Sequence, residues 1–254
     1  MPSRIRAAAF VLTGLIMAAP ASAQVVQSVQ FGGGYFWPKG LDARATGDVL
    51  QRDFEGRVLR GAPVVPNEPT PTDALVFHIG EFGSGHFFGE WNLGFGKHIE
   101  LGFGTGYSRQ TVPTIYRDVV DKKTGAEIRQ NLRLQMIPVT AVVRFFPFGG
   151  PGDVQPYVGA GVGVVHYRYS EFGNFVDTDT LEIFPDQFTA TGNAPTGLFL
   201  GGIRFPIGGD VYSLSIEGRF VHAVGDTGGI DNGFLDDKID MSGGLLNVSF
   251  HVHF

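Results

Sequence analysis

The chain has 254 residues, of which 43% are hydrophobic and 17% carry a charge, below the ~25% of an ordinary soluble protein. The absence of cysteine excludes disulfide scaffolds, cysteine zinc sites and thiol catalysis. The formal net charge of -6 argues against nucleic-acid binding, and the aromatic share of 13% argues against disorder.

Residues 1–23 have the pattern of a secretory signal peptide. A short basic segment with two arginines precedes an apolar stretch at 7–19, and a small-x-small cleavage site follows. The apolar stretch is shorter than the ~20 residues that a helix needs to span a bilayer. The sequence therefore predicts cleavage between Ala23 and Gln24, export of the chain, and one mature domain at 24–254.

The mature part contains about eight stretches of about ten residues in which apolar and polar side chains alternate. Period two places the two kinds of side chain on opposite faces of a β-strand. The predicted strands, in chain order, lie at 29–37, 87–95, 99–107, 137–145, 157–169, 199–205, 212–220 and 246–254. Eight amphipathic strands are the smallest set found in a transmembrane β-barrel.

The predicted connections alternate in length. Short turns are expected at 96–97, 148–153 and 208–209. Long polar connections are expected at 38–75, 108–131, 170–195 and 224–240. Membrane barrels have short periplasmic turns and long external loops, so the pattern predicts an all-β, eight-stranded, antiparallel, up-and-down transmembrane barrel with periplasmic mature termini. A soluble lipocalin-like barrel is the alternative, which the signal peptide and the loop asymmetry disfavour.

Aromatic residues gather near the predicted membrane boundaries. Those near the short turns or the last residue are Phe95, Phe148, Tyr157, Phe205, Tyr212 and Phe254. Those near the long connections are Tyr35, Trp37, Tyr107, Tyr167 and Phe220. Two aromatic girdles around an apolar band are typical of a barrel in an outer membrane.

Three segments carry a family resemblance. They are residues 134–169, which begin LQMIPVTAVVRFFPFGG, the segment IEGRF at 216–220, and the terminal VSFHVHF. All three resemble small Gram-negative outer-membrane barrels of the OmpA, OmpW and OmpX type. In that family the assembly machinery of the outer membrane reads the last strand and its terminal aromatic residue. The resemblance implies that Phe250, Val252 and Phe254 form this assembly signal.

Charged residues also fall on the predicted inward face. They are Glu90, Glu100, Arg144, Arg204, Glu217 and Arg219. Side chains just fill a barrel of eight strands, and an isolated buried charge is costly, so we expect these groups to pair in two tiers that close the lumen. The lower tier joins Arg144, Glu100 and Arg204, near the periplasmic end. The alternative is a gated narrow pore in which the same pairs rearrange.

Candidate catalytic residues are few. His166 and His222 are expected at the external rim, where polar residues occur in any such barrel. Ser249 and His251 have a spacing of two, but they are expected inside the periplasmic end, so we predict no hydrolytic site there.

Two acidic loop runs are candidate metal sites. Asp177 with Asp179, and Asp236 with Asp237, lack the spacing of a known calcium loop and are expected to be solvated. The strand glycines form no phosphate loop, because no Gly-Lys-Ser/Thr follows them. We therefore expect no metal site and no cofactor.

These features predict a monomeric outer-membrane protein whose barrel is the anchor and whose loops are the variable working surface, without catalysis. The expected partners are outer-membrane lipids, lipopolysaccharide and the barrel assembly machinery, and not nucleic acid. One alternative is a channel for small or hydrophobic solutes, which a continuous lumen or a lateral opening favours. Another is adhesion to a host surface, which strands projecting well beyond the membrane favour. A lipid-modifying enzyme is disfavoured by its missing motif.

Overall fold

The structure, a computed structural model, describes residues 25–254 except 64, 150–153, 208 and 210. The predicted signal peptide, with Ala23 and Gln24, lies outside the described residues. Eight strands dominate the described chain. They are β1 (Val25–Pro38), β3 (Ser84–Phe95), β4 (Ile99–Val120), β5 (Glu127–Phe145), β6 (Gln155–Val176), β7 (Ile183–Ile207), β8 (Tyr212–Asp226) and β10 (Gly243–His253).

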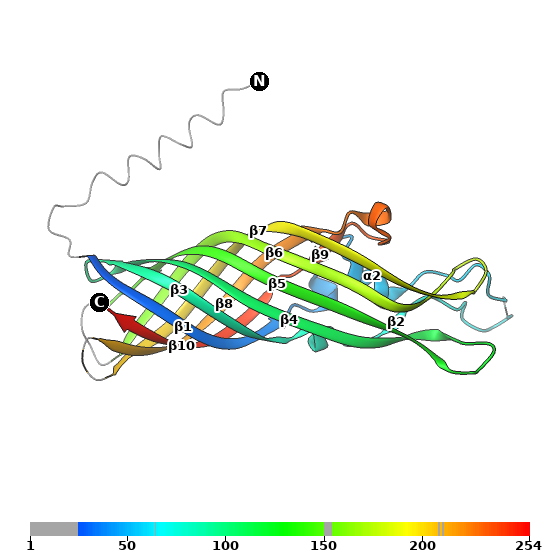
Figure 1. Cartoon of the computed structure of the whole chain (residues 1–254), viewed down its shortest axis with the longest axis horizontal. Helices are drawn as coiled ribbons and strands as arrows, with labels where there is room; N and C mark the ends of the chain where they lie inside the picture. The colour runs from blue at the N-terminus through cyan, green and yellow to red at the C-terminus, as the bar shows by residue number, and fades with distance from the viewer. Residues whose placement is uncertain (1–24, 64, 150–153, 208, 210) are drawn as a thin grey trace, which may run out of the picture.

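These strands form a closed ring. Each strand pairs antiparallel with the next, and β10 pairs with both β8 and β1. At the closing seam Phe31 lies opposite Phe250, and Val248 lies opposite Ile216. The start of β1 and the end of β10 lie at the same end of the molecule, at the left of Figure 1. The predicted all-β fold of eight antiparallel strands is confirmed.

Four strands are much longer than predicted. β4 has 22 residues, β5 has 19, β6 has 22 and β7 has 25. The predicted long connections at 108–131 and 170–195 are therefore wrong, because residues 121–126 and 177–182 alone join these strands. The long strands continue past the ring as a projecting sheet, which gives the molecule its elongated shape (Figure 1).

The reason for this error is visible along β5. Its outward side chains are apolar from Ile137 to Phe145 but polar at Arg129, Arg133 and Gln135. Its inward side chains differ too, because the projecting part buries Leu132 and Leu134, whereas the ring buries Arg144 beside the apolar Val142. A search for outward apolar residues therefore ends at the ring, although the strand continues.

Smaller elements lie beside the projecting sheet. They are η2 (Leu41–Ala43), α2 (Val49–Glu55), β2 (Leu75–Val76), η3 (Ile79–Phe82), η4 (Gly229–Asn232) and β9 (Lys238–Asp240). Among them, β2 pairs with β4 and β9 pairs with β8. Asp48 caps α2 by accepting hydrogen bonds from the backbone N–H groups of Leu50 (3.0 Å) and Gln51 (3.2 Å). Asp48 also binds Arg44 (2.7 Å). No helix among the described residues combines the length and the apolar character that crossing a membrane requires.

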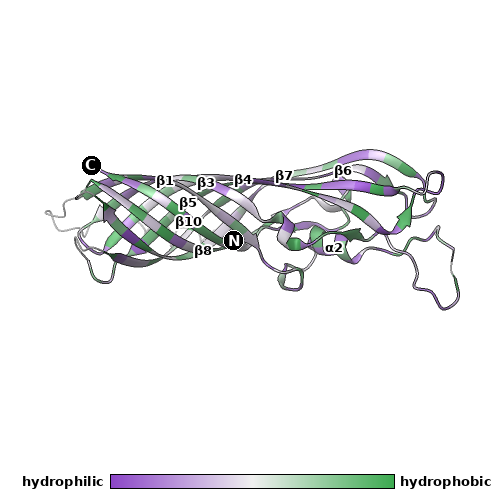
Figure 2. Ribbon diagram, turned by 90° about the horizontal axis from the view of Figure 1, so that it is seen from below, coloured by the Kyte–Doolittle hydropathy of each residue, from purple (hydrophilic) through white to green (hydrophobic). Residues whose placement is uncertain are grey.

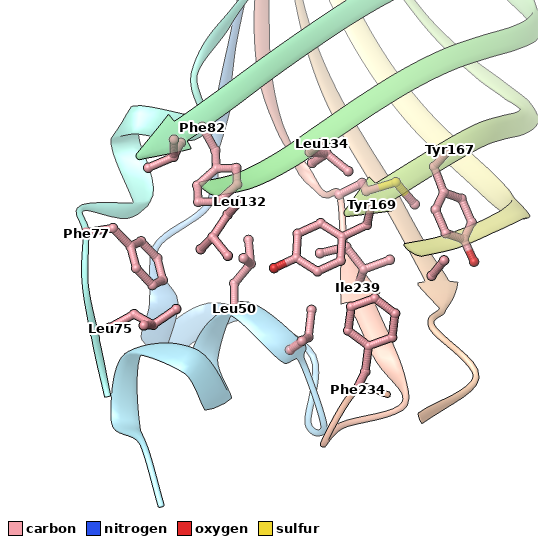
Figure 3. Packing of buried hydrophobic residues seen from close by; sticks show 14 of the residues in the cluster. Leu50, Leu75, Phe77, Phe82, Leu132, Leu134, Tyr167, Tyr169, Phe234 and Ile239 are labelled. Atoms are coloured by element: carbon pink, nitrogen blue, oxygen red, sulfur yellow. The ribbon is translucent and has the colours of Figure 1, made fainter. Parts of the chain in front are cut away.

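A hydrophobic core fills the space between these elements and the projecting sheet. Leu50 of α2 and Phe77 pack with Leu132 of β5, Tyr169 of β6 and Phe234, and all five are buried (Figure 3). This part of the molecule thus has its apolar groups inside and its polar groups outside, as a soluble domain does.

Candidate functional site

The outer surface of the ring is apolar. Along its strands hydrophobic and hydrophilic residues alternate (Figure 2), and the apolar set faces outward. Exposed outward residues include Val29, Phe31, Trp91, Phe103, Val139, Val143, Val158, Val162, Phe199, Ile203, Leu214, Ile216 and Val248. We call these residues the apolar belt. An exposed apolar surface that continues around a molecule marks contact with another apolar phase or partner.

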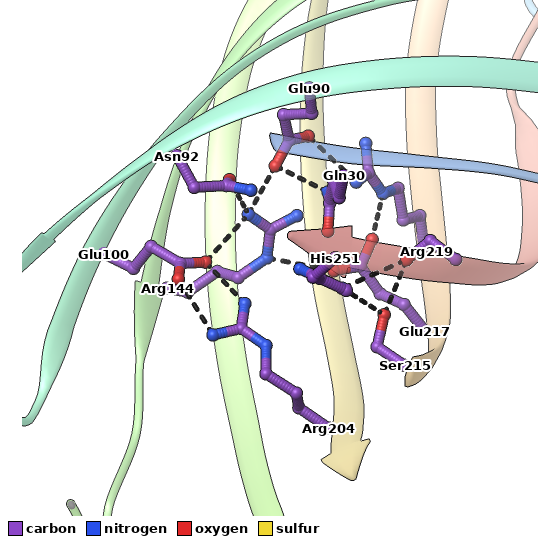
Figure 4. A network of polar contacts seen from close by, with 11 residues as sticks. Gln30, Glu90, Asn92, Glu100, Arg144, Arg204, Ser215, Glu217, Arg219 and His251 are labelled. Atoms are coloured by element: carbon purple, nitrogen blue, oxygen red, sulfur yellow. Dashed lines mark hydrogen bonds and ion pairs between the residues drawn. The ribbon is translucent and has the colours of Figure 1, made fainter. Parts of the chain in front are cut away.

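The inner surface of the ring is polar and charged except for a small buried hydrophobic cluster of Val142, Phe146, Tyr157, Leu198 and Leu200. All six charged residues predicted on this face join one connected network (Figure 4). Arg144 is completely buried and forms ion pairs with Glu90, Glu217 (3.0 Å) and Glu100 (3.4 Å). Arg204 binds both carboxylate oxygens of Glu100, at 2.8 and 2.9 Å.

The upper part of the network contains the remaining arginine. Arg219 pairs with Glu217 and with Glu90 (3.1 Å), and Gln30 donates a hydrogen bond to Glu90 at 2.9 Å. The expected separation into two tiers is wrong, because Arg144 reaches carboxylates of both tiers from the centre of the ring. A branched network of this kind satisfies charges that burial alone would make very costly.

Glycines on β4 make room for the network. A Cβ atom added at Gly102 would collide with the carboxylate of Glu90 and lie 2.8 Å from Oδ1 of Asn92. A Cβ atom at Gly104 would lie 3.0 Å from Cγ of Glu90. Because these glycines have no side chain, the charged side chain of the neighbouring strand can lie directly against the β4 backbone.

The space inside the ring is open at one end and closed by side chains farther in. At the end with the short turns, a recess of about 720 Å³ is lined in part by Glu100 and Arg204. Beyond the network, a cavity of about 40 Å³ lies between Glu90, Arg219 and Leu245. The buried hydrophobic core of the projecting sheet follows at the other end.

Two of the aromatic residues expected in the girdles face inward. Tyr157 is buried, and the Arg204 and Arg144 guanidinium groups lie 5.8 and 5.7 Å from its ring centroid. Tyr167 is buried, and its hydroxyl donates to the carbonyl of Asp226 at 2.6 Å. Both girdle predictions were wrong because each residue alternates with outward-facing neighbours on β6. The other aromatic residues named for the girdles are exposed or partly exposed.

The three residues of the expected assembly signal lie at the closing strand. Phe254 follows β10, and its side chain is 69% exposed. Its backbone N–H donates to the carbonyl of Gln27 (2.9 Å), and the backbone N–H of Gln27 donates to the carbonyl of Phe254 (3.3 Å). Val252 and Phe250 are partly exposed on the outward side of β10.

The residues considered for catalysis do not form a site with a carboxylate. Nδ1 of His166 contacts Asn193 at 3.0 Å, and Nδ1 of His222 contacts Ser242 at 3.0 Å. Neither histidine forms an ion pair within the part of the chain that the structure describes. His251 is buried, and its Nε2 lies 2.9 Å from the hydroxyl of Ser215.

The acidic loop runs are used in other ways. Asp177 accepts hydrogen bonds from the N–H groups of Asp179 (2.9 Å) and Thr180 (2.7 Å), and Asp179 pairs with Arg60 (2.8 Å). Across residues 25–254, with the gaps given above, no group of three or more histidine or acidic side chains is arranged to hold a metal ion.

Sequence reasoning missed one acidic pair beyond the ring. Asp53 of α2 and Glu171 of β6 share a hydrogen bond, and the hydroxyl of Tyr169 lies 3.3 Å from Asp53. Burial raises the pKa of Glu171 to about 7. Burial, followed by the nearby charge of Glu171, raises the pKa of Asp53 as well. Residues 53 and 171 lie far apart in sequence, and no local pattern connects them.

No family model and no curated protein match the chain. Among solved structures, Ail, the attachment invasion locus protein of Yersinia pestis, has 8% identity and a TM-score of 0.39 over 91% of this chain and 99% of that one. Neisserial surface protein A has 9% identity and a TM-score of 0.41 over 91% and 96%. Escherichia coli outer membrane protein W has 12% identity and a TM-score of 0.34 over 90% and 98%. These are small outer-membrane β-barrels, the group that the sequence resembles.

Proposed function

We propose that this chain is an integral outer-membrane β-barrel protein, in which the closed ring is a membrane anchor for an external sheet. The observation that carries the proposal is the inversion of polarity along one strand. On β5 the outward residues are apolar from Ile137 to Phe145 and polar in the projecting part. The interior changes in the other sense, because it holds the buried charge network in the ring and a hydrophobic core in the projecting part. The same strand thus fits two solvents, lipid around the ring and water around the projecting sheet.

The length of the apolar stretch fits a bilayer. Residues 137–145 correspond to the 9–11 residues, or about 30 Å of hydrocarbon, that a tilted transmembrane strand requires. The neighbouring strand β6 places Val164 beside Val139, so the apolar belt continues from β5 to β6 at this height. A soluble lipocalin-like barrel would expose its polar face to water, and this ring buries it.

The filled interior supports an anchor in preference to a channel. Arg144 is completely buried, the cavity above it measures about 40 Å³, and the core of the projecting sheet covers that cavity. An eight-stranded barrel has room for side chains but little more. The proposal therefore assigns the protein no transport and no catalysis, and it places the working surface outside the membrane.

Exposed arginines beyond the apolar belt are suited to contact the head groups of the surrounding lipid. Arg109 of β4 and Arg168 of β6 both lie beside Gln135, and Arg133 follows one step farther out. Arg109 and Arg168 are exposed and form no ion pair within the described residues. Arginine is well suited to bind phosphate, so we assign this rim to the phosphate groups of lipopolysaccharide.

One observation favours a second role, adhesion through the projecting sheet. β7 pairs with β8 only from Thr196 to Ile207, so its outer part, 183–195, has no strand partner on that side within the described residues. An exposed strand edge offers unpaired N–H and C=O groups to an extended segment of another protein. Strands that project beyond the membrane are also the feature expected of an adhesin.

Tryptophan fluorescence in bilayers tests the membrane assignment. The chain has two tryptophans, Trp37 near the outer limit of the belt and Trp91 in its middle. With Trp37 replaced by Phe, lipids brominated near the acyl-chain centre are expected to quench Trp91 strongly. Weak quenching of Trp91, together with a chain that stays monomeric in water without detergent, would support a soluble barrel instead.

A further inference from the structure

A cavity of about 230 Å³ lies under α2, outside the ring and beyond the apolar belt. Its lining comes from segments distant in sequence, because α2, the inner faces of β4 to β7, and the loop at 233–235 all contribute. Four carboxyl groups and two guanidinium groups line it, so the lining has an excess of negative charge. Asp73 holds one of these guanidinium groups, that of Arg57, at 3.0 Å.

The Asp53–Glu171 pair lies in this cavity. Glu171 is 7% exposed, and its Oε1 atom receives no hydrogen bond within the described residues. The tyrosine hydroxyl beside the pair supplies a donor, but two adjacent carboxylates need a positive charge or a proton between them. The structure thus places an unsatisfied carboxylate oxygen at the wall of a cavity large enough for a small molecule.

The remaining wall is aromatic. Phe175 stacks against Phe184 with ring centroids 6.1 Å apart and meets Phe188 edge to face at 4.8 Å. Phe234 continues the wall, 6.4 Å from Phe188. Carboxylates beside the faces of aromatic rings are the environment that recognises organic ammonium ions, through charge and cation–π attraction. A metal ion would need more ligands than the two carboxyl groups of the pair provide.

We propose that the cavity binds a small organic cation, a primary ammonium ion on an apolar or aromatic body, whose charge neutralises the Asp53–Glu171 pair. The ammonium group would donate to Oε1 of Glu171 and to Asp53, and its body would pack on Phe175 and Phe188. The proposal goes beyond the membrane anchor, since it concerns the outer part of the molecule alone.

Binding of such a cation competes with a proton. The groups that face the pair or line the same cavity are Asp48, Arg52, Arg57, Asp73, Tyr116, Tyr169 and Asp177. Burial raises the pKa of Glu171 to about 7 and raises the pKa of Asp53 as well, so the pair gains protons, and loses negative charge, as the pH falls. The cation needs both carboxylates ionised, so its affinity rises with pH and its binding releases a proton near pH 7.

The test uses the full mature chain refolded in lipid nanodiscs, with benzylammonium as the probe and titration calorimetry at pH 5 and pH 8. We expect saturable binding at pH 8, at least tenfold weaker binding at pH 5, and proton release measured in buffers of different ionisation enthalpy. Glu171→Gln is expected to weaken binding at least tenfold. Glu55→Gln, the matched control, removes the same charge from an exposed position of α2 and should leave the affinity unchanged.

Benzyl alcohol, which has the same ring without the charge, should not bind. The proposal is overturned if benzyl alcohol binds equally well, if Glu171→Gln binds like the unmodified chain, if Ca²⁺ displaces the probe at equal concentration, or if no binding occurs at pH 8. Insertion of each variant is followed by its heat-modifiable mobility. A chain that inserts normally but fails to bind benzylammonium overturns the cation site and leaves the membrane anchor standing.

Discussion

Arg144 is the residue on which the interior of the ring depends. It has no exposed surface and forms ion pairs with three carboxylates that come from β3, β4 and β8. Arg144→Ala would leave these carboxylates buried and short of a partner, so we expect it to lower the free energy of unfolding by about 3–5 kcal/mol. Lys97→Ala changes an exposed turn residue and should cost less than about 0.5 kcal/mol. Urea titrations in lipid vesicles measure both, and equal costs would contradict a network that stabilises the ring.

Glu171 makes the packing of α2 depend on pH. Burial raises the pKa of this carboxyl from 4.5 to about 7, so the protonated form favours the folded outer part. This contribution is complete below about pH 4.5 and is lost as the pH rises through about 7. We expect hydrogen exchange of the α2 amides, corrected for the intrinsic pH effect, to accelerate between pH 5 and pH 8.

Glu171→Gln keeps a neutral group of similar size and should largely remove this acceleration. Glu55→Gln, on the exposed side of the same helix, should retain it. An acceleration of the same size in Glu171→Gln would show that another group controls the packing of α2.

At the scale of the element, the two parts of a long strand tolerate a charge differently. Ile216 is 48% exposed in the middle of the apolar belt, whereas Gln187 is exposed on the projecting part of β7. Ile216→Arg is expected to cost about 2–4 kcal/mol in a bilayer, and Gln187→Arg about 0–1 kcal/mol. Unfolding in lipid vesicles gives both values. Similar values would contradict the assignment of the apolar belt to the lipid-facing surface.

The last strand closes the ring through its backbone, while the Phe254 side chain remains exposed. Phe254→Asp should therefore refold in lipid vesicles nearly as well as the unmodified chain. In cells we expect several-fold less folded protein in the outer membrane, because the family resemblance places the assembly signal at this residue. Phe148→Asp, a change at another exposed boundary aromatic, is the control. Normal cellular yield of the Phe254 variant would remove this residue from the assembly signal.

For the whole molecule, the proposed orientation places the projecting sheet outside the cell and the short turns in the periplasm. The chain lacks cysteine, so single cysteines report accessibility without background. A membrane-impermeant maleimide should label Glu68→Cys, in an exposed loop of the outer part, on intact cells. Lys97→Cys, in an exposed short turn, should react only after the outer membrane is permeabilised. The reverse pattern would invert the orientation.

Features that depend on local alternation could be predicted from the residues alone. The alternation of apolar and polar residues predicted all eight strands of the ring. It also predicted that Glu90, Arg144 and Glu217 lie on the inner face. The resemblance to small outer-membrane barrels agreed with this pattern. These results were accessible because a strand's two faces are set by neighbouring residues, whatever the strand pairs with.

How far the strands extend, and which distant groups meet, depends on packing between segments far apart in the chain. β5 and β6 continue beyond the ring because a separate core, built from α2 and Phe234, covers their inner faces. The contacts of Arg144 with three strands depend on the closure of the ring, and the Asp53–Glu171 pair depends on how α2 packs on β6. Such contacts join residues that are far apart in sequence, so alternation along one strand carries no information about them.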